Sequence, residues 1–94
     1  MEIYNMDSMK FMELVHNAMK DLLTRKKYNN KEELMAEATK EVELAKKANN
    51  HDAELVYTEA YEKLDNLTWK ECKLFIEIIK DAEKASKEDE KGMN

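Results

Sequence analysis

Residues 67–79 read LTWKECKLFIEII and contain the clearest local signal in the chain. Thr68 and Glu71 have the spacing of a capping box, in which the hydroxyl and the carboxylate each accept a hydrogen bond from a backbone N–H group at the start of a helix. The sequence therefore predicts a helix that begins at residue 69 and continues to about residue 86.

The apolar residues of this helix fall on two adjacent stripes. One consists of Cys72, Phe75, Ile76 and Ile79, and the other of Leu74, Ile78, Ala82 and Ala85. A helix that is apolar this far round its surface is either central to the fold or in contact with a partner. We expect the side that carries Leu74 and Ile78 to bind another protein or a second copy of the chain.

Three further segments upstream show helical periodicity, at about residues 8–27, 31–48 and 52–65, and residues 87–94 are expected to form a frayed, charged tail. In the first segment the apolar residues recur at steps of three and four, as on the buried face of a helix. Asn-rich joints separate the segments. The apolar pattern continues through the joint at residues 49–51, so a single helix over 31–66 is the alternative to a break there.

The composition also favours helices. The chain has one Gly and no Pro, and Ala, Glu, Lys, Leu and Arg make up 49 of its 94 residues. Turns and sheets need Gly and Pro more often than this, whereas such a share of these five residues is typical of long helices. We predict an all-α fold, a compact bundle of three to four antiparallel helices in a single domain over residues 1–94.

The charge distribution bears on partners and location. The net charge is −5, and residues 31–66 alone carry five basic and ten acidic groups. Phosphate backbones require a basic surface, so we expect no nucleic-acid partner. No stretch has the ~18 apolar residues of a membrane span, and no signal peptide is evident at the N-terminus. Together with a single cysteine, these features predict a cytoplasmic location.

Few residues in the sequence are candidates for catalysis or for binding a metal ion. Thioether and imidazole groups suit Cu(I), and a row of them lies near one face of the first segment: Met6, Met9, Met12, His16 and Met19. A core-filling role for these methionines is the alternative that we favour. Cys72 lies on a predicted buried stripe, where a thiol is inert. No metal-binding or phosphate-binding motif occurs, and we expect neither an enzyme nor a bound cofactor.

Two other groups are candidates for an interface. Tyr57, Tyr61 and Trp69 are aromatic residues of the kinds enriched at interaction hot spots, although a core aromatic cluster is the alternative. Glu33, Glu37 and Glu41 repeat at a spacing of four, which places them on one side of a helix. That row is either a solvated face or an acidic docking strip for a basic partner.

These observations predict a non-catalytic module that binds proteins, such as a regulator or inhibitor encoded by a phage or mobile element. Residues 67–79 also resemble the last-helix pattern of small bacteriocin immunity proteins of the enterocin A type, with a capped turn followed by an apolar helix. That resemblance implies a cytoplasmic four-helix bundle with an immunity function. A small-molecule or copper-binding protein is the second alternative.

Overall fold

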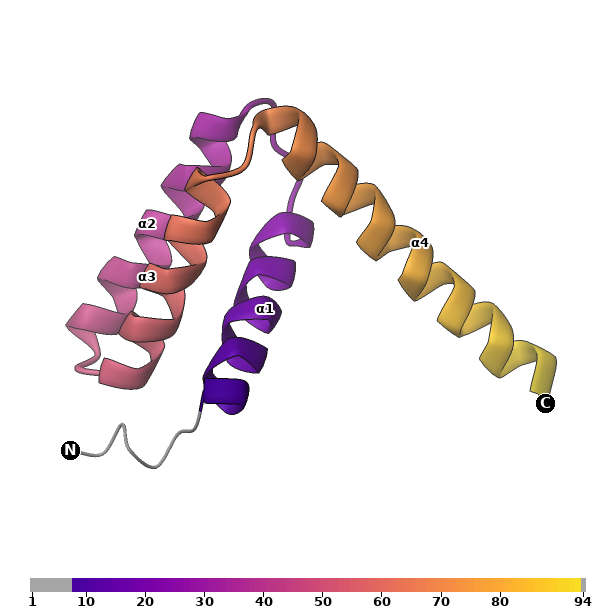
Figure 1. The fold of residues 1–94 in the computed structure, drawn as a ribbon, viewed down its shortest axis with the longest axis horizontal. Helices are drawn as coiled ribbons and strands as arrows, with labels where there is room; N and C mark the ends of the chain where they lie inside the picture. The colour runs from indigo at the N-terminus through magenta and orange to yellow at the C-terminus, as the bar shows by residue number, and fades with distance from the viewer. Residues whose placement is uncertain (1–7, 94) are drawn as a thin grey trace.

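The computed structural model describes residues 8–93, and the side chains of residues 8–85. This part of the chain forms four helices and no strand, in the order α1 Ser8–Thr24, α2 Lys31–Lys47, α3 His51–Asp65 and α4 Trp69–Met93. Helices α1, α2 and α3 run in alternating directions, and α4 turns away from them at an oblique angle (Figure 1). The predicted all-α bundle is confirmed, and each helix lies close to its predicted position.

Helix α1 is shorter than predicted, since it ends at Thr24 and not at residue 27. The reason is Tyr28, whose side chain folds back and whose hydroxyl donates a hydrogen bond of 2.5 Å to the carbonyl oxygen of Leu22. That carbonyl belongs to the last turn, where helical acceptors lack partners within the helix. Burial, followed by the charge of Glu37, raises the pKa of Tyr28 to about 12, so the hydroxyl keeps the proton that it donates.

Two asparagine caps define α2 and α3. Asn30 accepts a hydrogen bond from the backbone N–H of Glu33, and Asn50 accepts one from the backbone N–H of Ala53. Asn49, between α2 and α3, has a φ of 55°, in the left-handed region that ends a helix and that Asn tolerates better than most residues. Residues 31–66 therefore form two helices, and the alternative of a single helix is wrong.

The capping box at the start of α4 is confirmed. The backbone N–H of Thr68 donates to Glu71 Oε1 at 2.8 Å, and the backbone N–H of Glu71 donates to Thr68 Oγ1 at 3.1 Å. The other end of α4 lies seven residues beyond the predicted end, at Met93. Residues 87–91 are Lys, Glu and Asp, and because Lys and Glu are good helix formers the charge of this segment does not stop the helix. The predicted frayed tail is therefore wrong up to Met93, and Asn94 lies outside the described residues.

The core lies between α1, α2 and α3 and under the start of α4. Its largest fully buried side chains are Leu22, Leu34, Leu64, Val15 and Cys72. Alanines such as Ala38 and Ala60 are also fully buried, and their small size lets α2 and α3 approach closely as a hairpin.

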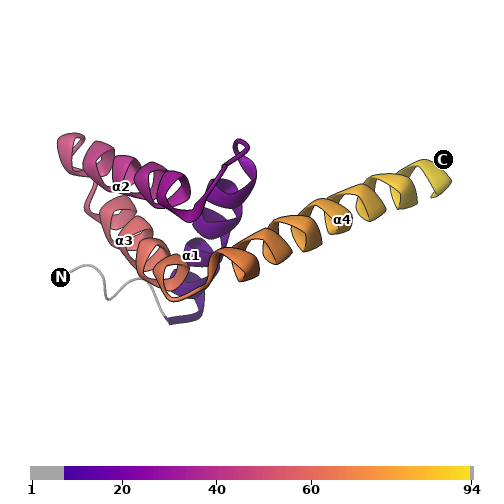
Figure 2. The same ribbon diagram turned by 90° about the horizontal axis from the view of Figure 1, so that it is seen from above.

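Helix α4 leaves the other three helices along most of its length. Only its first turns pack on the core, through the buried Cys72 and the partly buried Trp69, Ile76 and Ile79, and its main neighbour is α1. Figure 1 and Figure 2 both show the rest of α4 extending away from α1–α3. At 1.5 Å per residue, its 25 residues span about 37 Å, so much of α4 has no neighbour within this chain.

Candidate interaction surface

The largest exposed apolar side chains of α4 lie on one side of that helix. Leu74, Phe75 and Ile78 are 58%, 44% and 52% exposed, and the smaller Ala82 and Ala85 continue the same side and are also exposed. We call these five residues the α4 stripe. Phe75 was predicted on the buried stripe with Cys72, which is wrong, because only Cys72, Ile76 and Ile79 of that group meet the core.

The exposure of the α4 stripe follows from the arrangement of helices. Apolar residues cover more than half of the circumference of α4 near its start, and α1 covers only the part that includes Cys72 and Ile76. Burying a large aliphatic or aromatic side chain contributes about 1.5–3 kcal/mol. About half of the surface of each of these three residues thus stays in water, although its burial in a complex would be favourable.

A small groove lies where α1 and α4 diverge. It has a volume of about 230 Å³ and is lined by His16, Met19, Lys20, Leu23, Phe75 and Ile79. Its walls are apolar except at His16 and Lys20. Phe75 belongs both to the groove and to the α4 stripe. The groove therefore extends the apolar surface of α4 onto α1.

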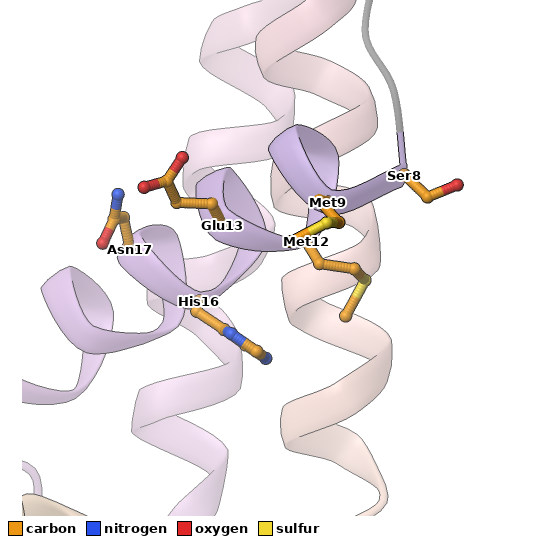
Figure 3. A pocket seen from close by; sticks show the side chains of 6 residues that line it. All are labelled: Ser8, Met9, Met12, Glu13, His16 and Asn17. Atoms are coloured by element: carbon orange, nitrogen blue, oxygen red, sulfur yellow. The ribbon is translucent and has the colours of Figure 1, made fainter.

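The predicted Met/His row forms a second hollow on α1, shown in Figure 3. This hollow, of about 440 Å³, is lined by Ser8, Met9, Met12, Glu13, His16 and Asn17. Met12 and His16 extend to the same side of α1, and Met9 is 84% exposed. Met6 lies outside the described residues. Because His16 also lines the groove beside α4, the methionine-rich side of α1 and the α4 stripe border one another.

The predicted aromatic candidates lie away from the α4 stripe. Tyr57, Tyr61 and Trp69 are partly buried and pack against the core. Tyr61 lines a different hollow, between α2 and α3, with Thr39, Val42, Lys46, Glu54 and Thr58. Burial raises the pKa of Tyr57, as do the nearby charges of Asp21 and Glu41. The core alternative is thus the better description of these aromatic residues.

The acidic row on α2 is occupied by contacts within the chain. Arg25, just after α1, contacts Glu37 at 3.2 Å and Glu41 at 2.6 Å, and also pairs with Asp21. Lys26 contacts Glu37 at 3.3 Å, whereas Glu33 accepts a hydrogen bond of 2.9 Å from the backbone N–H of Asn29. The row therefore joins α2 to the end of α1, and we make no proposal for it as a docking strip.

Burial and ion pairing shift the pKa values of Arg25 and Glu37 in opposite directions. Burial alone lowers the pKa of Arg25, but hydrogen bonds to Glu41 and Asp21 outweigh it and raise that pKa. Burial likewise opposes the charged form of Glu37, and the hydrogen bond and charge of Lys26 nevertheless lower its pKa. Arg25 and Tyr28 were not singled out from the sequence. The only signal in the sequence was that residues 25–30 consist of Lys and Asn apart from Arg25, the one Arg of the chain, and Tyr28.

The thiol of Cys72 is fully buried, and burial raises its pKa. A thiolate is required for nucleophilic attack, so this position disfavours catalysis by Cys72. Among the side chains of residues 8–85, no three His, Cys, Asp or Glu groups are placed to share a metal ion. No helix in the same range combines the length and apolar character needed to cross a bilayer.

Comparison with protein-family models, curated proteins and solved structures finds no match to this chain. Residues 67–79, on which the resemblance to bacteriocin immunity proteins rests, form the joint before α4 and its first three turns. That resemblance stays a prediction.

Proposed function

We propose that this chain is a non-catalytic module that binds proteins through the α4 stripe, and that it regulates or inhibits its partner by covering part of the partner's surface. The observation that carries the proposal is the exposure of Leu74, Phe75 and Ile78 along one side of a helix that has few neighbours. Exposed apolar patches on small soluble domains mark interaction sites.

The chemistry of the surface supports a helical partner. From Phe75 onward the α4 stripe repeats at steps of three and four residues, so its side chains project as the anchors of a helix that lies against another helix. The adjoining side of α1 contributes Met9, Met12 and Met19. Methionine side chains are flexible and polarizable, and they adapt to partners of varied shape.

The charged residues near this surface are compatible with reversible binding. His16 and Lys20 lie at the groove between α1 and α4, and Glu13 lies beside the methionines of α1. Both signs are thus present at the edge of an apolar centre. This arrangement, an apolar centre with a polar rim, is that of protein–protein interfaces in general.

The proposal is tested by capture of partners from lysate of the source organism with the wild-type chain and with the Leu74→Lys/Ile78→Lys double variant. We expect the wild type to retain proteins that the double variant loses. A matched control is Leu44→Lys/Leu55→Lys, which replaces two leucines that are 48% and 45% exposed on α2 and α3. If the two double variants capture the same proteins as the wild type, the α4 stripe is not the binding surface.

A further inference from the structure

We propose that the α4 stripe binds a basic amphipathic helix of another protein, whose Lys or Arg side chains contact Glu71 and Asp81. This inference rests on the proposed function, because it names the chemistry of the partner that the same surface takes. Two features of α4 carry it: the sign of the charges that adjoin the stripe, and the helical spacing of the stripe itself.

The charged residues nearest to the α4 stripe are acidic. Residues three or four apart are neighbours on the surface of a helix. Glu71 precedes Leu74 and Phe75 by three and four residues, and Asp81 likewise has one stripe residue three positions before it and another four positions after it. Both acidic residues are exposed. A partner that covers the stripe therefore meets two negative charges.

The other charged residues of α4, up to residue 85, lie farther from the stripe. Lys70 and Glu77 each have a single stripe residue, Leu74, at a spacing of four or three, and their charges are opposite. The remaining four have no stripe residue at these spacings: Lys73, Lys80, Glu83 and Lys84. The net charge beside the stripe is therefore negative, although α4 contains several lysines.

The two carboxylates are accessible to a partner. Asp81 forms no ion pair with any side chain of residues 8–85. One oxygen of Glu71 accepts the capping hydrogen bond of 2.8 Å from the backbone N–H of Thr68, and the residue is nevertheless exposed. The acidic row on α2 is by contrast paired with Arg25 within the chain. The acidic residues of α4 are thus the better contacts for a basic partner.

The positive charges of α1 lie at the opposite edge of the stripe. His16 and Lys20 line the groove together with Phe75 and Ile79 of α4. At 3.6 residues per turn, Asp81 falls on the side of the stripe away from Phe75 and Ile79. A partner helix can therefore turn its basic side toward Asp81 and away from Lys20, which fixes how it faces the stripe.

The sign of these charges decides between kinds of partner. A second copy of the chain would bring the acidic residues of both chains onto one apolar surface, where like charges repel. Anionic bilayers and nucleic acids attract basic surfaces and repel acidic ones. A basic protein segment is the partner whose charge complements the stripe.

The spacing of the stripe sets the form of that segment. From Phe75 onward the steps are three, four and three residues, as on a helix that packs against another helix. Leu74 to Ala85 span about 16 Å, so a partner helix of about three turns covers the stripe. Glu71 and Asp81 are about 15 Å apart along the axis, so the basic residues that meet them are about ten or eleven positions apart. Figures 1 and 2 show that α4 extends away from α1–α3, which leaves room for such a helix.

The sign of the partner is tested with two model peptides and isothermal titration calorimetry. Both peptides carry Leu at alternating steps of three and four residues, and the positions between are Lys in one peptide and Glu in the other. We expect wild type to bind the Lys peptide about tenfold more tightly than the Glu peptide, because its charge complements the stripe. Equal binding of both, preference for the Glu peptide, or no binding of the Lys peptide would overturn the proposal.

The part of the two carboxylates is isolated by the double variant Glu71→Gln/Asp81→Asn. Gln can replace Glu in a capping box, so the helical signal in circular dichroism should be kept. The variant should bind the Lys peptide about 3–30-fold more weakly than wild type at low salt, because exposed ion pairs contribute modestly. The difference should shrink at high salt, which screens such pairs.

The matched control is Glu62→Gln/Glu83→Gln, which removes two exposed charges that do not adjoin the stripe. It should bind the Lys peptide as wild type does. Equal weakening by the two double variants would mean that only the net charge of the chain matters, and the proposed contacts would then be wrong.

The proposed function can stand without this inference. If Leu74→Lys/Ile78→Lys loses partners from lysate while wild type does not bind the Lys peptide, the stripe binds proteins but not through basic residues. Sedimentation equilibrium should find wild type monomeric. A dimer that the same variant abolishes would assign the stripe to a second copy and contradict the basic partner.

Discussion

At the scale of single residues, burial separates side chains that the sequence pattern treats alike. Leu64 is fully buried in the core, Ile76 is partly buried beside it, and Ile78 is about half exposed. All three lie at apolar helical positions, but periodicity gives only the direction of a side chain on its own helix. Whether a neighbouring helix covers that direction is decided by tertiary packing.

Replacing these residues with Ala should therefore give a graded series. Leu64→Ala should lower the free energy of unfolding by about 2–5 kcal/mol, the range for buried aliphatic side chains. Ile76→Ala should cost about 1–2 kcal/mol, because part of its surface is already in water. Urea unfolding followed by circular dichroism measures both. Equal losses for the two variants would show that α4 is packed more closely than the structure has it.

The ion pairs that Glu37 makes with Arg25 and Lys26 predict that the stability of the chain depends on pH. The pKa of Glu37 is lowered from 4.5 in the folded chain, so between the lowered value and 4.5 the unfolded chain binds more protons at this residue. Its stabilising contribution is therefore complete above about pH 4.5 and is lost as the pH falls through the lowered pKa. We expect Glu37→Gln to flatten the acid limb of a plot of unfolding free energy against pH. Glu62→Gln, on the exposed side of α3, is the control and should leave that limb unchanged.

At the scale of helices, the start of a capped helix could be predicted from the sequence, whereas the ends of α1 and α4 could not. Thr68 and Glu71 predicted the start of α4 from the sequence, because a cap needs only local hydrogen bonds. The end of α1 was misplaced, since it depends on a contact between Tyr28 and Leu22 across six residues. The candidate interface residues differ in the same way in how far local sequence predicts their surroundings. The exposed side of α4 followed from an excess of apolar residues, whereas the pairing of Glu37 and Glu41 with Arg25 depended on how α1 and α2 pack.

The Asn49 joint gives a prediction at this scale. Asn49 has a positive φ, which costs residues with a Cβ about 1–2 kcal/mol, although Asn is more tolerant and Gly bears no such cost. Asn49→Ala should therefore destabilise the chain by about 1 kcal/mol in thermal or urea unfolding, and Asn49→Gly should be neutral or slightly stabilising. If Ala and Gly behave alike here, the left-handed turn between α2 and α3 is not what separates these helices.

At the scale of the whole molecule, three helices build the core and the fourth presents a surface. The core is largely complete with α1–α3 and the first turns of α4, so the exposed side of α4 from Leu74 to Ala85 is available for contacts outside the chain. This division explains how a small domain keeps a wide apolar helix. It also locates the proposed binding surface on α4 and the adjoining side of α1, away from the core.

The most direct test of this account is the free energy of unfolding of Leu74→Lys/Ile78→Lys, measured in urea at a protein concentration at which wild type is monomeric. Because both side chains are more than half exposed, the variant should keep its helical signal and lose less than about 1 kcal/mol, as expected for two surface substitutions. A loss of several kcal/mol, or an unfolded variant, would contradict the account. It would show that these side chains are buried in the monomer, where an unpaired charge is very costly.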